Sequence, residues 1–196
     1  MLAAIKNRRS IRKYQDIAIP EEDIRQILEA GILAPSSKNR QPWEFIVVSG
    51  QSKQSMLLAM QQGLSREKNL PLLPNSNCHL AGAEYTLQIM QQAPVTILVV
   101  NKLGADIWEA LNPEERVYEI CNAQSIGAAI QNMTLTATEL GLGSLWICDT
   151  YFAHQELNAW LNMDGELIAA LTIGYAAEQP AARPRAQFDE VVSWRS

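Results

Sequence analysis

The segment 116–140 constrains the fold more than any other part of the chain. Its middle, residues 125–137, is small or apolar nearly all round, and a helix with this pattern is buried on most of its sides. Three small residues within it, Gly127, Ala128 and Ala129, would let a second backbone come close. We therefore expect a long central helix that packs against another helix of the fold or against a second copy at a two-fold dimer seam.

Shorter apolar segments supply the predicted strands, and further helices lie between them. A strong helix start stands at Pro20, because proline suits the first helical position and the acids at 21–23 suit its positive end. Gly141 is expected to cap the long helix. We expect strands at 44–48, 95–100, 144–148 and 167–175, and helices at 2–9, 20–32, 51–62, 81–92, 116–140 and 155–161.

Three segments lack the apolar periodicity of helices and strands. Residues 63–80 and 102–115 are too long for simple connections, so each is a candidate lid or specificity loop. The tail, residues 177–196, carries prolines and an arginine pair but no pattern typical of an internal element.

Composition places the chain among single-domain globular proteins. Its 196 residues are 47% hydrophobic, which suits one domain over 1–196. A formal net charge of −5 argues against general nucleic-acid binding, which needs a broad basic surface. No apolar run approaches the length of a membrane span. The first residues place apolar side chains before charged ones, unlike a signal peptide, so we expect a cytoplasmic protein.

Cysteine and histidine indicate neither a disulfide framework nor a metal centre. Cys78, Cys121 and Cys148 show no paired spacing, and His79 and His154 stand outside any ligand pattern. We therefore expect no metal. The sequence also lacks the G-x-S-x-G pattern of a serine hydrolase.

A basic cluster near the start stands out in this acidic chain. Residues 6–13 hold five of the sixteen Lys and Arg residues, among them Arg8 and Arg9 next to Ser10. Such a run is either a solvated basic face or an anion site. Arginine forks and a serine hydroxyl suit a phosphate, and a second pair, Arg183 and Arg185, lies near the other end. If the two ends meet, four guanidiniums can converge on one dianion.

A second polar segment, residues 35–43, precedes the first predicted strand. Two prolines bracket Ser36, Ser37 and Asn39, which offer many short donors and acceptors. The segment is either ordinary turn chemistry or a ligand-contacting loop. Trp43 ends the segment, and considered by itself it is expected to lie in the core rather than to contact a ligand.

Four motifs, in this order along nearly the whole chain, resemble the FMN-dependent nitroreductase family. The resemblance implies an α+β fold with a central, mostly antiparallel sheet flanked by helices. It also implies an intertwined homodimer with two FMN sites at the interface, each built from both chains. The matching motifs are Arg8-Arg9-Ser10-Ile11-Arg12, residues 35–43, the Gln131-Asn132 helix that ends in Gly141-Leu142-Gly143 before residues 144–147, and Ile173-Gly174-Tyr175 followed by Arg183-Pro184-Arg185.

The resemblance also implies roles for individual residues. Arg8, Arg9 and Ser10 would hold the phosphate and ribityl chain of FMN, and Arg12 would reach the pyrimidine edge, where a cation tunes the flavin. Near residues 86–89 the chain has neither the Asn nor the Lys with which some members touch FMN. The implied further contacts are Arg183 and Arg185 on the phosphate, Leu145, Trp146 and Ile147 along the ring through strand-end backbone, and Pro35, Ser36, Ser37 and Asn39 from the other chain.

The implied activity is that of a flavin-dependent oxidoreductase. NADH or NADPH would reduce FMN, which would reduce a nitroaromatic, quinone or similar small flat acceptor by a ping-pong mechanism. The flavin performs the redox chemistry itself, which agrees with the absence of an acid–base pair among the motifs. The alternatives are a reductive dehalogenase or a flavin-modifying enzyme on the same fold, and an FMN-binding protein without turnover.

Overall fold

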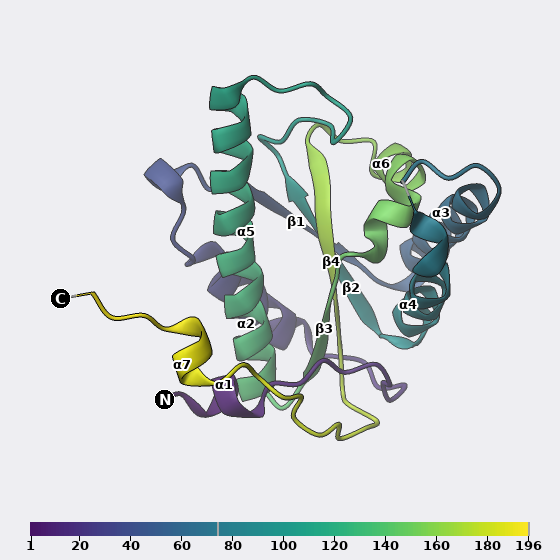
Figure 1. Cartoon of the computed structure of the whole chain (residues 1–196). Helices are drawn as coiled ribbons and strands as arrows, with labels where there is room; N and C mark the ends of the chain where they lie inside the picture. The colour runs from purple at the N-terminus through teal and green to yellow at the C-terminus, as the bar shows by residue number, and fades with distance from the viewer. Residues whose placement is uncertain (74, 196) are drawn as a thin grey trace.

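The computed structural model describes residues 1–73 and 75–195. Residue 74, within the predicted segment 63–80, and residue 196, within the predicted tail 177–196, lie outside the described residues. Figure 1 shows the elements in space. In chain order they are α1 (Ala3–Asn7), α2 (Glu21–Ile32), η1 (Ser37–Asn39), β1 (Trp43–Val48), α3 (Gly50–Asn69), η2 (Ser76–Cys78), α4 (Leu80–Gln92), β2 (Val95–Asn101), α5 (Pro113–Glu139), β3 (Gly143–Ile147), η3 (Asp149–Ala153), α6 (His154–Leu161), β4 (Glu166–Gly174) and α7 (Phe188–Val191).

The sheet has the order β1-β2-β4-β3, and each neighbouring pair is antiparallel. Successive side chains of a strand point to opposite faces, so the buried strand β2 serves two cores. Its Ile97 packs with α2 and α5 on one face, and its Leu98 packs with α3, α4 and α6 on the other. Figure 1 shows these helices on the two sides of the sheet. The predicted α+β class with an antiparallel sheet is confirmed.

The predicted central helix is α5, and its partner within the fold is α2. Ile126, Ile130 and Met133 are completely buried. The two helices approach closely at Gly31, where a Cβ would lie only 2.9 Å from Cγ of Met133. The helix begins at Pro113 rather than at residue 116.

A capping box explains the earlier start of α5. The Asn112 side chain accepts hydrogen bonds from the backbone N–H groups of Glu114 and Glu115 at 2.9 and 3.0 Å. The Glu115 carboxylate accepts one from the Asn112 N–H at 2.8 Å. Pro113 takes the first helical position, where its missing N–H costs nothing. The prediction assigned these residues to an excursion and therefore missed the cap.

The prediction for 51–62 was too short, because α3 continues to Asn69. The predicted helix ended at residue 62, but the next residue, Gly63, is buried and packs against η3: a Cβ there would lie 2.2 Å from Cβ of Ala153. Leu64 and Glu67, in the added turns, are also buried. The excursion 63–80 is therefore largely helical, with a second helical turn at η2.

The four predicted strands are present within a few residues of their predicted ends, and Trp43 is buried as expected. The prediction did not include the short elements η1, η2, η3 and the tail helix α7. Among the described residues, no helix combines the length and apolar character that a membrane span requires.

Candidate functional site

The N-terminal segment lies along the outer edge of β3. Ser10 and Ser144 form a parallel bridge, and the Ile11 N–H donates to the Ser144 carbonyl at 3.0 Å. Gly143 makes this approach possible, because a Cβ there would lie only 2.7 Å from Cγ1 of Ile11. The sheet edge thus holds the backbone that carries the first arginines.

The C-terminal tail turns back along the same N-terminal segment. Tyr14 and Ala176 form an antiparallel bridge, and the Ala177 N–H donates to the Lys13 carbonyl at 2.9 Å. Figure 1 shows α1 and α7, the first and last helices of the chain, together at the foot of α5.

One contact that holds these two segments together was missed by sequence reasoning. The Arg12 N–H donates to Oε1 of Glu178 at 2.5 Å. Glu178 is the only acid between 176 and 185, where the other charged residues are Arg183 and Arg185. The presence of a single acid in this stretch was the one sequence feature that could have identified the contact.

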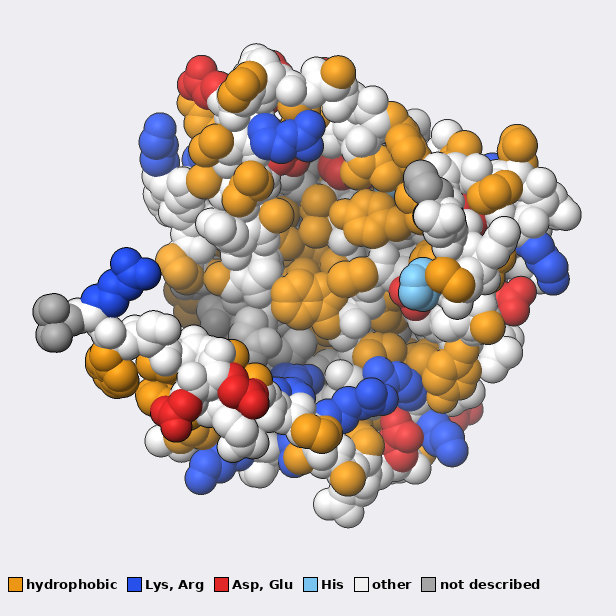
Figure 2. Space-filling model, in the orientation of Figure 1, with side chains coloured by type: hydrophobic (Ala, Val, Ile, Leu, Met, Phe, Trp, Pro, Cys, Tyr) orange, Lys and Arg blue, Asp and Glu red, His pale blue; other side chains and the backbone are white. Residues whose placement is uncertain are grey.

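The two arginine clusters meet in one pocket of about 140 Å³. In Figure 2, Lys and Arg side chains gather along the lower rim of the central hollow. The ends of the chain therefore meet as the charge argument required. The pocket is lined by Arg8, Arg9, Ser10, Arg12, Arg183 and Arg185 together with residues 180–182.

The pocket gathers five positively charged guanidiniums. Arg9 donates to the Lys6 carbonyl at 2.6 Å, and Arg185 donates to the Pro184 carbonyl at 3.1 Å. Within the described part of the chain, none of the five guanidiniums in the pocket forms a salt bridge with a carboxylate. Converging guanidiniums beside a serine hydroxyl are suited to an anion with several oxygens, such as a phosphate.

The predicted contacts Leu145, Trp146 and Ile147 follow Ser144 along β3, which bridges to Ser10 of the pocket. Leu145 and Ile147 are buried in the core, so their side chains cannot face a ligand over the sheet. Trp146 points the other way and is 40% exposed. It lies against α5, where a Cβ on Gly127 would be 3.6 Å from its ring. Any contact from the two buried residues would therefore use the backbone.

The loop with Pro35, Ser36, Ser37 and Asn39 does not line the basic pocket of its own chain. It lies against the N-terminal half of α5, where the Ser37 N–H donates to Oγ of Ser125 at 3.2 Å. Figure 1 shows the region that follows α2 well away from the two chain ends. The structure thus places six of the predicted contacts in one pocket and three along the adjoining strand β3, and leaves these four apart from them.

The backbone of this loop is strained. Lys38 and Asn39 have φ values of 51° and 52°, and Gln41 has 46°. Non-glycine residues adopt this left-handed region only when the surroundings hold them there, and such residues concentrate at functional sites. The fold therefore holds this loop in a specific conformation, at a place separate from the basic pocket.

Comparison with known proteins now assigns the family. The model of the nitroreductase family matches residues 5–175. The chain belongs to the nitroreductase family. A protein of Archaeoglobus fulgidus, provisionally named NADH dehydrogenase/NAD(P)H nitroreductase, is 34% identical to this family member over 186 residues, covering 91% of this chain and 86% of the relative.

Solved nitroreductase structures agree with the fold of this family member. A protein from Desulfovibrio desulfuricans, provisionally called a nitroreductase and solved in complex with FMN, is 29% identical; the match covers 98% of this chain and 95% of that chain, with a TM-score of 0.72. An FMN-dependent nitroreductase from Mycobacterium smegmatis, solved with NADPH, is 20% identical over 98% and 96% of the two chains, with a TM-score of 0.75. A Rhodospirillum rubrum relative named 5,6-dimethylbenzimidazole synthase is 27% identical over 88% of this chain and 80% of its own.

Proposed function

We propose that this chain is an FMN-dependent NAD(P)H oxidoreductase that reduces a nitroaromatic, a quinone or a similar small flat acceptor. The observation that carries the proposal is the pocket in which both ends of the chain place arginines around Ser10. A phosphate is the anion that such a group of donors suits best. The FMN complex of the Desulfovibrio relative supports flavin mononucleotide as its source.

Each residue of the pocket has a binding role in this proposal. Arg8, Arg9 and Ser10 hold the phosphate and the ribityl chain, while Arg183 and Arg185 close over the phosphate from the tail. Arg12 reaches the pyrimidine edge of the ring. The backbone of 145–147 lies along the ring, and Trp146 covers part of the strip beside it.

FMN, when bound, supplies the redox chemistry, taking a hydride from NADH or NADPH and passing electrons to the acceptor. The residues of this chain bind and orient it on the strip between β3 and α5. One open slot above that strip would serve both substrates in turn. This predicts ping-pong kinetics, with parallel lines in double-reciprocal plots.

We further propose a homodimer in which the loop 35–39 completes the FMN site of the partner subunit. The loop cannot serve the basic pocket of its own chain, which it does not line. Large apolar side chains stand exposed on α5 and on the tail, including Val117 at 55%, Val191 at 68% and Trp194 at 85%. Burial against a second copy would remove this apolar surface from water.

The proposed location is the cytoplasm, where reduced nicotinamide is supplied. Cys78, Cys121 and Cys148 are all free thiols, as a reducing compartment maintains them.

An anaerobic absorption spectrum tests the proposed function. The purified protein should carry flavin bands, or acquire them from added FMN, and NADH or NADPH should bleach them. Addition of a nitroaromatic or a quinone should then restore the bands. Bands that both nicotinamides leave unchanged would overturn the oxidoreductase proposal and support FMN binding without turnover. A protein that takes up no FMN would overturn the assignment of the basic pocket.

A flavin-modifying activity is the second candidate. The relative named 5,6-dimethylbenzimidazole synthase favours it, because its named product contains the dimethylbenzene ring that flavin also contains. Oxygen, added after anaerobic reduction, distinguishes the two. The reductase should recover its full flavin absorbance, whereas a flavin-modifying enzyme should lose part of it at every cycle.

A further inference from the structure

A second pocket lies at the opposite end of β3 from the arginines. It has a volume of about 370 Å³, which is within the usual range for a small-molecule site. Its walls come from the segment 105–111, the first turns of α5, η3 and the start of β4. Ile107, Ile120 and Ile168 give it apolar surface, and Tyr151 adds an aromatic ring.

The strip proposed for the flavin leads directly into this second pocket. Ser144, near the start of β3, bridges to Ser10 in the basic pocket, and η3, just after the strand, brings Tyr151 to the second pocket. The five residues of β3 span roughly 16 Å at about 3.3 Å each. On α5, Gly127 faces Trp146, and Ala123 one turn earlier lines the second pocket. Figure 2 shows one continuous hollow with a hydrophobic floor here.

The charge of the second pocket is opposite to that of the first. Asp106, Glu109, Glu119 and Glu166 line it, against the single cation Arg116. This negative charge affects the pKa of a neighbouring tyrosine. The pKa of the Tyr151 phenol is raised, first by burial and then by the charges of Glu166, Cys148 and Glu119.

Two of these carboxylates face the pocket from semi-buried or buried positions. Glu166 is 2% exposed, and its Oε1 bonds to the His154 ring. Glu119 accepts a hydrogen bond from the Asn101 amide at 3.3 Å. Burial raises the pKa of Glu119, and the charge of Glu166 raises it further. Carboxylates that line a pocket with little access to water favour a ligand that brings a hydrogen-bond donor or a positive charge.

We propose that the second pocket receives the electron acceptor and that its carboxylates select flat aromatic acceptors with a cationic substituent over anionic ones. This inference rests on the proposed function, because it assigns the substrate class of the same site. The apolar walls take the ring, and Glu119 and Glu166 face the charged substituent. An anionic acceptor would meet like charges in a partly desolvated pocket, which costs binding energy.

Glu119 is the side chain to test, because Glu166 also holds His154 in the core. In Glu119→Gln the amide oxygen can still accept from Asn101 while the negative charge is gone. The matched control is Glu84→Gln, an exposed glutamate on α4 that lines neither pocket. FMN affinity and melting temperature of each variant establish that the site and the fold are retained.

The charge preference of the pocket can be measured without catalysis, by the equilibrium binding of two aromatic probes that carry fixed, opposite charges. Phenyltrimethylammonium and benzenesulfonate are titrated calorimetrically into the FMN-loaded protein. The wild type and Glu84→Gln should bind the cation at least about tenfold more tightly, and Glu119→Gln should lose most of that preference. Equal affinities in the wild type, or an unchanged preference in Glu119→Gln, would overturn the proposal.

Turnover with (4-nitrophenyl)trimethylammonium and 4-nitrobenzenesulfonate supplies the second arm. The KM ratio of the two acceptors should move by about tenfold in Glu119→Gln, and nicotinamide should still bleach the flavin of this variant. Failure of the nicotinamide to bleach FMN would count against the proposed function alone. Bleaching at the normal rate with no charge preference between acceptors would count against the acceptor pocket alone.

Discussion

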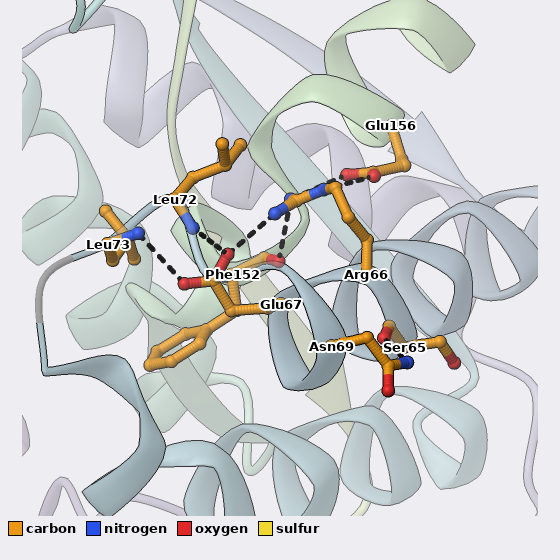
Figure 3. Close-up of polar contacts among 8 residues, drawn as sticks. All are labelled: Ser65, Arg66, Glu67, Asn69, Leu72, Leu73, Phe152 and Glu156. Carbon is orange, nitrogen blue, oxygen red and sulfur yellow. Dashed lines mark hydrogen bonds and ion pairs between the residues drawn. The ribbon is translucent and has the colours of Figure 1, made fainter.

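Nε of Arg66 donates to Oε1 of Glu156 at 2.7 Å and so links α3 to α6. The same guanidinium donates to the Phe152 carbonyl at 3.3 Å and, at 2.6 Å, to the neighbouring carboxylate of Glu67. Figure 3 shows these contacts, with the Glu67 carboxylate also accepting from the N–H groups that follow the helix. This network ties the end of α3 to η3, the element that brings Tyr151 to the second pocket.

Replacing Glu67 should destabilise the protein more than replacing any surface acid. The side chain is fully buried and accepts from the Leu72 and Leu73 N–H groups, each at 3.0 Å. Glu67→Gln removes one of the two carboxylates that pair with Arg66, leaving Glu156, and turns an NH₂ group toward backbone donors, at a cost of roughly 3 kcal/mol. That corresponds to a fall in melting temperature of roughly 6–12 °C in a chain of this size. Glu22→Gln, an exposed i,i+3 partner of Arg25, should stay within about 1 kcal/mol of wild type.

Acidification should remove the contribution of Glu67 at low pH. Burial acts to raise the pKa of this carboxyl, but donation from Leu72, Leu73 and Arg66 outweighs it, and the pKa lies below its ordinary value. The folded pKa is thus lower than the unfolded value of about 4.3. The stabilisation is complete above the unfolded pKa and is lost as pH falls through the folded pKa. Urea unfolding between neutral pH and about pH 3 should show a shallower loss of stability for Glu67→Gln than for wild type; equal slopes would exclude this role.

Removal of Arg185 should weaken FMN retention. A charge-assisted contact contributes roughly 1.5–3 kcal/mol, so Arg185→Ala should raise the dissociation constant roughly 10- to 150-fold. Fluorescence titration of the flavin measures this directly. Arg25→Ala, whose guanidinium pairs with surface acids of α2, is the control and should bind FMN normally. An Arg185→Ala protein with wild-type affinity would take this residue out of the site.

The contact between Gly143 and Ile11 should control the position of the whole N-terminal arginine cluster. Gly143→Ala places a methyl group 2.7 Å from Cγ1 of Ile11, so the N-terminal segment must shift or the core must strain, at roughly 1–3 kcal/mol. We expect lower stability together with weaker FMN binding. Gly82→Ala, in a helix with nothing within 4 Å of the added methyl group, should be neutral or stabilising by up to about 1 kcal/mol. Normal FMN binding by Gly143→Ala would show that the bridge does not position the arginines.

Mixed dimers test whether the loop 35–39 serves the partner subunit. One chain carries Arg9→Ala and Arg185→Ala, and the other carries Ser36→Ala and Asn39→Ala. If each FMN site combines the basic pocket of one chain with the loop of the other, the mixed dimer has one intact site and one doubly defective site. Each variant homodimer should then bind FMN weakly, while the purified heterodimer binds one FMN per dimer tightly. A heterodimer no better than the two homodimers would place the loop outside the partner's site.

Local sequence was sufficient for the elements that depend on neighbouring residues. The small and apolar side chains of 125–137 required a helix buried on most sides, and α5 is that helix. The apolar β-branched runs became the four strands of the sheet. Where a local signal competed with packing, the local signal failed. The predicted helix ended at residue 62, but in the fold Gly63 lets α3 continue close to Ala153.

The sequence by itself determined the helices and strands, the family motifs and the presence of two arginine clusters that need an anion. Only the tertiary structure decided that these clusters share one pocket, because the contact between Arg12 and Glu178 spans 166 positions of the chain. It also decided that the loop 35–39 lies apart from this pocket and that carboxylates gather at the far end of β3. Such relationships arise when strands pair and helices pack, and no local pattern encodes a distance between residues so far apart along the chain.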